Sequence, residues 1–421
     1  MKQAQFDRIE ARLPELLSDL GAARVPDYFD DMLQQTGRSR QRPAWSLLER
    51  WLPMGVIARP ALASLPAWRP ILIGVLVVLA VVAGALIYVG SRPTPLPPPF
   101  GPAGNGNLYF TDARGDVFAM DPATFTPRTI IAGRNQYRAP LPSRDGRLIA
   151  FLKGDQVFLA NSDGSNVRAL PGHYPQIEEQ DWSADSAHLG IRSVINGKAA
   201  LTILNADGSG AKTLSPKGDL EVGDFSFLPD ERILFFGTGT VASSDTWGIY
   251  TMNADGTDAR PIVPPSRRDG DFIAPLPSPD GKSVIYFVWR DPDEHGVLYS
   301  TDIATGKSHK IGLTDNAQDE YEVPQFSPDG TKILVSRFNE CCRTLTIASV
   351  EGGPPIDIGE RIDGGSGPVA SAFFSPDGTS VIAWYPNSRK LWLLDPTGVK
   401  PDREIGVALS DAPTWQRIAM P

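Results

Sequence analysis

Carboxylate side chains recur at intervals in the segments that lead into predicted strands. The candidate ligand-binding residues are Asp181, Asp224, Asp271, Glu320, Glu322 and Asp411. If the fold brings these loops together, their oxygen atoms could bind a hard cation such as calcium, or a basic peptide. The alternative is that polar loops simply keep a folded domain soluble. Both interpretations depend on how the strands are arranged.

Residue types that commonly carry catalysis are sparse. The four histidines, His173, His188, His295 and His309, show no spacing typical of metal ligands, so no zinc site is predicted. A Gly-x-Ser-x-Gly nucleophile motif is also absent from the sequence. We therefore predict no catalytic residue and no cofactor, with calcium as the one weak candidate. An enzyme whose residues are scattered over many strands stays an alternative.

Cys341 and Cys342 are adjacent and are the only two cysteines of the chain. An oxidising compartment would permit a vicinal disulfide between them. The alternative is a pair of reduced or separately buried thiols.

A four-residue turn motif recurs along the chain. Ser-Pro-Asp-Gly occurs at residues 278–281, 327–330 and 375–378, each time before an apolar run. Degenerate copies carry Asp145, Asp185 and Asp230, and Ser186 and Glu231 replace the glycine in two of them. Proline, aspartate and glycine favour a tight turn at these positions. The gaps between successive aspartates are 40, 45, 50, 49 and 48 residues, which is the period of a propeller or repeat array.

A second signature recurs within each period, an apolar strand that ends in a polar turn. Its copies include residues 157–164, 201–208 and 249–256, the last of which reads IYTMNADG. Two hairpins per period make four strands, which is one propeller blade. Together, the two signatures resemble the TolB-type, WD40-like β-propeller repeat over roughly residues 106–418. That resemblance implies an all-β propeller that uses one face to hold a protein partner.

The ends of the repeat region predict how the ring closes. The first segment, residues 108–121, lacks a preceding turn motif, and the last segment, around Trp415, has the lead-in to a strand with nothing after it. We predict that the C-terminal strand completes the first blade and removes open sheet edges. Six full units and this composite give seven blades over residues 106–419. Six blades, the alternative, would need about 52 residues each, more than the measured gaps.

The region before the propeller divides into three segments. Residues 1–70 predict a tail of short amphipathic helices, with an interfacial helix or a docking peptide near Trp45 and Trp51. Residues 71–89 are uninterruptedly apolar and uncharged, which predicts one transmembrane helix. Residues 90–105 are rich in proline and predict a stiff spacer between membrane and propeller.

Charge predicts the topology. Arg50, Arg59 and Arg69 precede the apolar run, whereas only Arg92 closely follows it, so the N-terminus is expected in the cytoplasm. Residues 1–70 carry a net charge of +2 and residues 92–421 a net charge of −11. An acidic propeller argues against a nucleic-acid partner. We expect a single-pass plasma-membrane protein with an extracytoplasmic propeller.

Two classes of function stay open. The first is a membrane-anchored binding module, a scaffold or a transmembrane sensor, with a protein partner on the propeller face and a cytoplasmic partner of the tail. The tail, span and ectodomain resemble the architecture of transmembrane anti-sigma-like regulators, but no histidine or cysteine occurs before His173 for a zinc-type signature. The second class is an extracytoplasmic propeller enzyme such as a hydrolase or lyase.

Overall fold

The computed structural model describes residues 68–90, 95–133, 137–216, 220–241, 244–267, 272–290, 294–313, 320–339, 342–359, 371–385, 390–407 and 409–420. They form two units, one ending at Arg92 and the other running from Pro93 to the C-terminus. The short helices predicted before residue 68 lie outside the described residues.

The described part of the first unit is one helix, α4 (Trp68–Gly90). It begins three residues before the predicted span and ends one residue after it. Its side chains are described only from Leu72 to Gly84. Over the described residues, no helix reaches the length and apolarity that crossing a membrane requires. The predicted transmembrane helix is therefore not confirmed.

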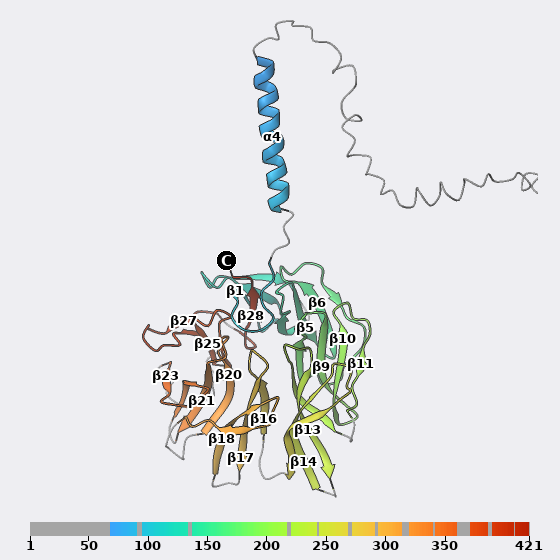
Figure 1. The fold of residues 1–421 in the computed structure, drawn as a ribbon, viewed down its shortest axis with the longest axis vertical. Helices are drawn as coiled ribbons and strands as arrows, with labels where there is room; N and C mark the ends of the chain where they lie inside the picture. The colour runs from blue at the N-terminus through green and yellow to red at the C-terminus, as the bar shows by residue number, and fades with distance from the viewer. Residues whose placement is uncertain are drawn as a thin grey trace, which may run out of the picture. The chain divides into compact units, whose positions relative to one another are not determined.

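The second unit is a ring of seven four-stranded antiparallel sheets, so the predicted all-β, seven-bladed propeller is confirmed (Figure 1). The composite blade, named for its two chain ends, contains β28 (Thr414–Ile418), β1 (Gly104–Thr111), β2 (Val117–Met120) and β3 (Pro127–Ile131). Blade 1 contains β4 (Arg138–Pro142), β5 (Leu148–Lys153), β6 (Gln156–Asn161) and β7 (Arg168–Ala169). Blade 2 contains β8 (Glu179–Trp182), β9 (His188–Ile195), β10 (Lys198–Asn205) and β11 (Lys212–Thr213).

The remaining four blades follow the same order along the chain. Blade 3 contains β12 (Glu221–Phe227), β13 (Ile233–Val241), β14 (Ser244–Met252) and β15 (Arg260–Arg267). Blade 4 contains β16 (Phe272–Pro277), β17 (Ser283–Arg290), β18 (Glu294–Asp302) and β19 (Ser308–Lys310). Blade 5 contains β20 (Glu320–Phe326), β21 (Lys332–Asn339), β22 (Cys342–Ser349) and β23 (Ile356–Ile358). Blade 6 contains β24 (Ser371–Phe374), β25 (Val381–Tyr385), β26 (Lys390–Leu394) and β27 (Arg403–Ile405).

The two ends of the propeller sequence meet in the composite blade, as predicted. β28 pairs antiparallel with β1, with Leu108 opposite Trp415 and Tyr109 opposite Thr414. Gln416 adds a buried contact, because its Nε2 atom donates to the carbonyl of Gly146 in blade 1 at 2.6 Å. The C-terminal strand therefore supplies the innermost strand of the composite blade and ties it to its neighbour.

The repeated turn motif works as its residue types predict. The Ser278 hydroxyl donates to Asp280 at 2.7 Å and accepts the amide of Ser283 at 3.0 Å. Gly281 takes a φ of +69° at the last turn position. In the degenerate turns Ser186 and Glu231 take φ values of +59° and +65°, which normally disfavour residues with a side chain. The turn geometry therefore survives the loss of glycine.

Those two replacements make contacts that glycine could not. The Ser186 hydroxyl accepts the amide of Asp145 at 3.0 Å, and a Glu231 carboxylate oxygen accepts the amide of Asp185 at 2.9 Å. Each bond joins a turn to the turn of the preceding blade. The unusual backbone is thus offset by a hydrogen bond between blades.

The hydrophobic core lies between adjacent blades. One cluster joins Leu152 and Leu159 of blade 1 to Trp182 and Leu189 of blade 2, and all four side chains are at most 3% exposed. Another joins Leu108 and Phe110 to residues of blade 6 across the closure. Each Å² of apolar surface buried between blades contributes about 25 cal/mol to stability, so each blade depends on both neighbours for its stability. The inner strands are consequently held around the channel.

Candidate functional site

The innermost strand of every blade borders a central cavity of about 430 Å³. The cavity opens at the end of the channel where the turn motifs lie, and this opening is called the mouth here. Its aromatic lining includes Trp182, Phe227, Phe326, Phe374 and Trp415, and its charged lining is Arg144, Asp181 and Arg417. Within the described residues, all seven inner strands contribute side chains to this one cavity.

The second turn position supplies residues to the rim of the mouth. Proline occupies it at 279, 328 and 376, and these prolines line the cavity. Arginine stands at the same position in blade 1, as Arg144. Arg417 lies 41 residues after Pro376, one period on, so it takes this place in the composite blade. Two neighbouring blades therefore present arginine where blades 3 to 6 present proline and blade 2 presents Ala184.

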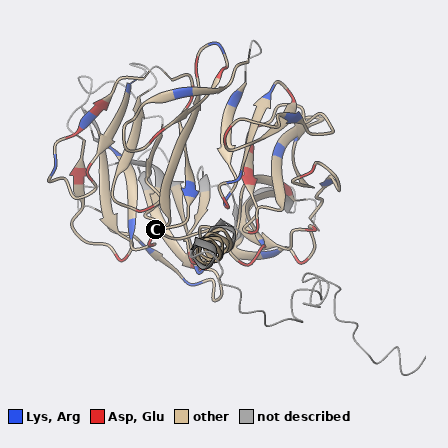
Figure 2. Ribbon diagram, turned by 90° about the horizontal axis from the view of Figure 1, so that it is seen from above, with Lys and Arg blue, Asp and Glu red and all other residues tan. Residues whose placement is uncertain are grey.

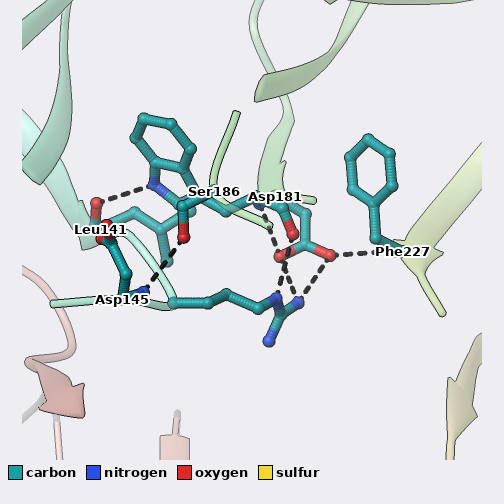
Figure 3. A network of polar contacts seen from close by, with 7 residues as sticks. Leu141, Asp145, Asp181, Ser186 and Phe227 are labelled. Atoms are coloured by element: carbon teal, nitrogen blue, oxygen red, sulfur yellow. Dashed lines mark hydrogen bonds and ion pairs between the residues drawn. The ribbon is translucent and has the colours of Figure 1, made fainter. Parts of the chain in front are cut away.

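Asp181 and Arg144 form an ion pair at the rim (Figure 3). Arg144 Nη2 lies 2.8 Å from Asp181 Oδ1, and its Nε donates to the carbonyl of Trp182 at 2.9 Å. The other Asp181 oxygen accepts the amide of Phe227 in blade 3 at 3.0 Å. The two side chains are only 21% and 19% exposed. Asp181 thus links three blades, and the positive charge of Arg144 already compensates its negative charge.

Asp224 belongs to a second cluster, centred on Arg192. Arg192 reaches Glu178 at 2.5 Å, Asp224 at 2.7 Å and Glu179 at 3.2 Å. Burial and the nearby Asp224 carboxylate raise the pKa of Glu179 to about 8. One arginine faces three carboxylates here, and proton uptake by Glu179 relieves the excess negative charge.

Asp411 lies just before β28 and is also engaged in structure. Its Oδ1 atom accepts the hydroxyl of Thr111 at 2.5 Å, and its Oδ2 atom accepts the amide of Ala139 at 2.8 Å. Ala139 has a φ of +51° and its carbonyl accepts Gln180 Nε2 at 2.7 Å. Asp411 therefore holds an unusual backbone conformation at the junction of the composite blade and blade 1.

The predicted carboxylates do not form one site in the described part of the chain. Asp181, Asp224 and Asp411 have separate partners in three different networks. Asp271 and Cys341 lie outside the described residues, as do the side chains of Glu320, Glu322 and Cys342. The described residues contain no group of three or more His, Cys, Asp or Glu that could hold a metal ion.

The proline-rich segment lies against the mouth. Residues 95–103, called the strap here, precede β1, and Pro99, Phe100 and Gly101 line the cavity. Phe100 stacks on the Arg144 guanidinium, whose carbon is 4.2 Å from the ring centre. Ala103 donates its amide to the carbonyl of Pro376 at 2.9 Å. This described part of the predicted spacer is therefore docked on the propeller, which the proline content alone could not indicate.

Charges are distributed over the ring without one dominant patch. In Figure 2 the basic and acidic residues are interspersed around the described blades. The mouth is distinguished by its cavity, its aromatic residues and its two arginines.

The fold places the chain among the β-propellers, and solved structures share that architecture. The propeller domain of the Trilobed protease from Pyrococcus furiosus is 14% identical with a TM-score of 0.53, over 74% of this chain and 97% of that chain. Oligogalacturonate lyase from Vibrio parahaemolyticus is 10% identical with a TM-score of 0.52, over 69% and 91%. TolB from Acinetobacter baumannii is 16% identical with a TM-score of 0.47, over 74% and 82%.

The first two likenesses show the fold alone, because both identities are below the level at which activity can be transferred, and the TolB likeness, with a TM-score under 0.5, carries no argument. No family model matches the chain. No curated protein matches it either. The function must therefore be argued from the site.

Proposed function

We propose that this chain is a membrane-anchored, extracytoplasmic β-propeller that binds a protein or ligand at the mouth of its channel. The observation that carries the proposal is the cavity of about 430 Å³ to which all seven inner strands contribute. Its lining combines aromatic surface with a few oriented polar groups, the composition typical of binding sites. The described charged residues at the rim form ion pairs and hydrogen bonds within the protein, which favours a binding function over catalysis.

The proposed anchor is the apolar run at residues 71–89, and it rests on the sequence. Nineteen uncharged residues suffice to span a bilayer as a helix. The excess of arginine before the run places the tail in the cytoplasm and the propeller outside. Alkaline extraction and protease protection in right-side-out vesicles test this proposal. Release of the protein by alkali, or a propeller protected from external protease, would contradict it.

The binding proposal is tested by crosslinked co-purification from native membranes. The full chain should retain an extracytoplasmic partner, and a form that lacks residues 1–60 should retain the same partner. Loss of a cytoplasmic protein only from the shortened form would identify the partner of the tail. If neither form retains a partner or ligand after crosslinking, the binding module is rejected.

The alternative of a propeller enzyme receives no specific support. The lyase and the protease named above share the fold with this chain, and a shared fold does not transfer an activity. We therefore do not assign catalytic residues.

A further inference from the structure

The strap contacts the mouth in the way that a bound peptide would. Arg417 donates from Nε and Nη2 to the carbonyl of Pro98, at 3.3 and 3.1 Å, and from Nη2 to the carbonyl of Gly101. The strap bends between these two carbonyls, at residues 99–101, and Gly101 takes a φ of +77°. Arg417 therefore binds two carbonyls that another segment with the same bend would also present.

The propeller, and not the strap, fixes the position of the Arg144 guanidinium on which Phe100 stacks. Asp181 and the carbonyl of Trp182 hold the Arg144 guanidinium in place. Phe100 then lies over that guanidinium in a cation–π contact. Because the blades fix the orientation of Arg144, the position above it would accept an aromatic ring from another chain equally well.

Arg417 needs such a segment because the propeller offers it no counter-charge. Among the described residues, no carboxylate lies within ion-pair distance of Arg417. Burial, with a smaller contribution from Arg144, lowers the pKa of Arg417 to about 10. Removing the strap would take from Arg417 its hydrogen bonds to the carbonyls of Pro98 and Gly101 and leave the guanidinium to water. A departing strap is therefore best replaced by another segment with free carbonyl groups.

The N-terminal half of the strap is packed on one side only, because Pro97 is buried whereas Leu96 and Pro98 are exposed. Leu96, Pro97 and Pro99 border a second space of about 410 Å³, whose other walls include Ala184, Pro229 and Glu231. Leu96 remains 51% exposed. Space beside one half of the strap allows an incoming segment to bind before the strap has fully left.

We propose that the mouth recognises a proline-rich peptide that bends at an aromatic residue followed by glycine, as the strap does at Phe100 and Gly101, and that the strap occupies this site until such a segment of a partner displaces it. The inference rests on the proposed function and names the class of its partner. Recognition uses backbone carbonyls bound by Arg417, an aromatic ring stacked on Arg144 and a proline ring at the cavity, as Pro99 is placed in the strap.

The test uses the full chain in detergent and a fluorescent synthetic peptide with the sequence of residues 93–103. A tethered strap competes at an effective concentration on the order of millimolar, so the wild-type chain should bind the peptide weakly. Phe100→Ala weakens the strap and leaves the mouth intact. It should raise the apparent affinity for the peptide about two- to fivefold. The double variant Phe100→Ala/Arg417→Gln should lose this gain.

Two controls make the result specific. Phe125→Ala removes a comparable ring, whose centre is 5.2 Å from the guanidinium carbon of Arg403 in blade 6. Phe125 lies between the outer strands β2 and β3, so the variant should leave peptide binding at the wild-type level. A peptide with alanine in place of its phenylalanine should bind Phe100→Ala about two- to fivefold more weakly than the original peptide. Equal binding of the two peptides, or no gain in Phe100→Ala, would overturn the inference. If crosslinking still captures a partner at the mouth in that case, the proposed function stands and only the partner class is wrong.

Discussion

Gln416, five residues before the C-terminus, contacts two blades at once. Its Nε2 atom donates to Gly146 in blade 1 at 2.6 Å, and its Oε1 atom accepts the amide of Asn107 at 3.1 Å. Gln416 stands where complete repeats place the serine of the turn motif. One side chain therefore replaces a turn at the point where the ring closes.

Gln416→Ala should lower the free energy of unfolding by about 2–4 kcal/mol, because it leaves two buried backbone groups without partners. Urea denaturation followed by tryptophan fluorescence measures the change. Thr129→Ala, on the exposed face of β3, is the control and should change stability by less than about 0.5 kcal/mol. Equal stabilities of the two variants would contradict the described closure.

Asp181→Asn should destabilise the propeller by about 1.5–3 kcal/mol, because Arg144 loses a charged partner in a mostly buried position. Asp230→Asn is a matched control, since the Arg232–Asp230 pair is 39% and 55% exposed. Exposed ion pairs contribute about 0–1 kcal/mol, so the control should have a small effect. Comparable losses in the two variants would show that Asp181 is not a tie between blades.

The pH dependence of stability should contain a contribution from Glu179. Its pKa is about 8 in the folded protein, above the ordinary value of 4.5, so the folded state holds this proton where the unfolded chain has released it. The free energy of unfolding should therefore fall as pH rises from about 4.5 to about 8, and then level off. Glu179→Gln should flatten this slope in urea titrations at several pH values. Parallel curves for the variant and the wild-type chain would contradict the assignment.

Phe100→Ala should loosen the strap without opening the ring. Loss of the contact with Arg144 should increase hydrogen exchange at Gly101 and Ala103 about two- to fivefold, for a contact of about 0.5–1 kcal/mol. Mass spectrometry of the peptide that covers these amides gives the rate. Phe125→Ala should leave the rate unchanged, and an unchanged rate in Phe100→Ala would mean that Phe100 does not hold the strap.

The fold was largely predictable because its signals are local and repeated. Each Ser-Pro-Asp-Gly turn places its glycine at positive φ, and the unpaired C-terminal segment around Trp415 indicated how the ring closes. The degenerate turns were harder to interpret. Ser186 and Glu231 looked like weakened copies, yet each makes a bond to the preceding blade that the sequence does not reveal.

The site was less predictable because it depends on partners far apart in sequence. Acidic loops suggested shared ligands, but Asp181 is paired with Arg144, 37 residues away, and Asp411 bonds to Ala139, 272 residues away. Arg144 and Arg417 were missed, although both stand at the proline position of the repeat. Substitution of a rim proline by a charged residue was the available signal.

The central claim is that a partner binds at the mouth, and site-specific photocrosslinking tests it most directly. In one variant a benzophenone amino acid replaces Pro229, an exposed residue that borders the space beside the N-terminal half of the strap. In the control variant it replaces Thr129 on the outer strand β3. After irradiation of native membranes, position 229 should give a discrete crosslinked partner that position 129 does not give. Crosslinks from position 129 alone, or identical products from both positions, would contradict binding at the mouth.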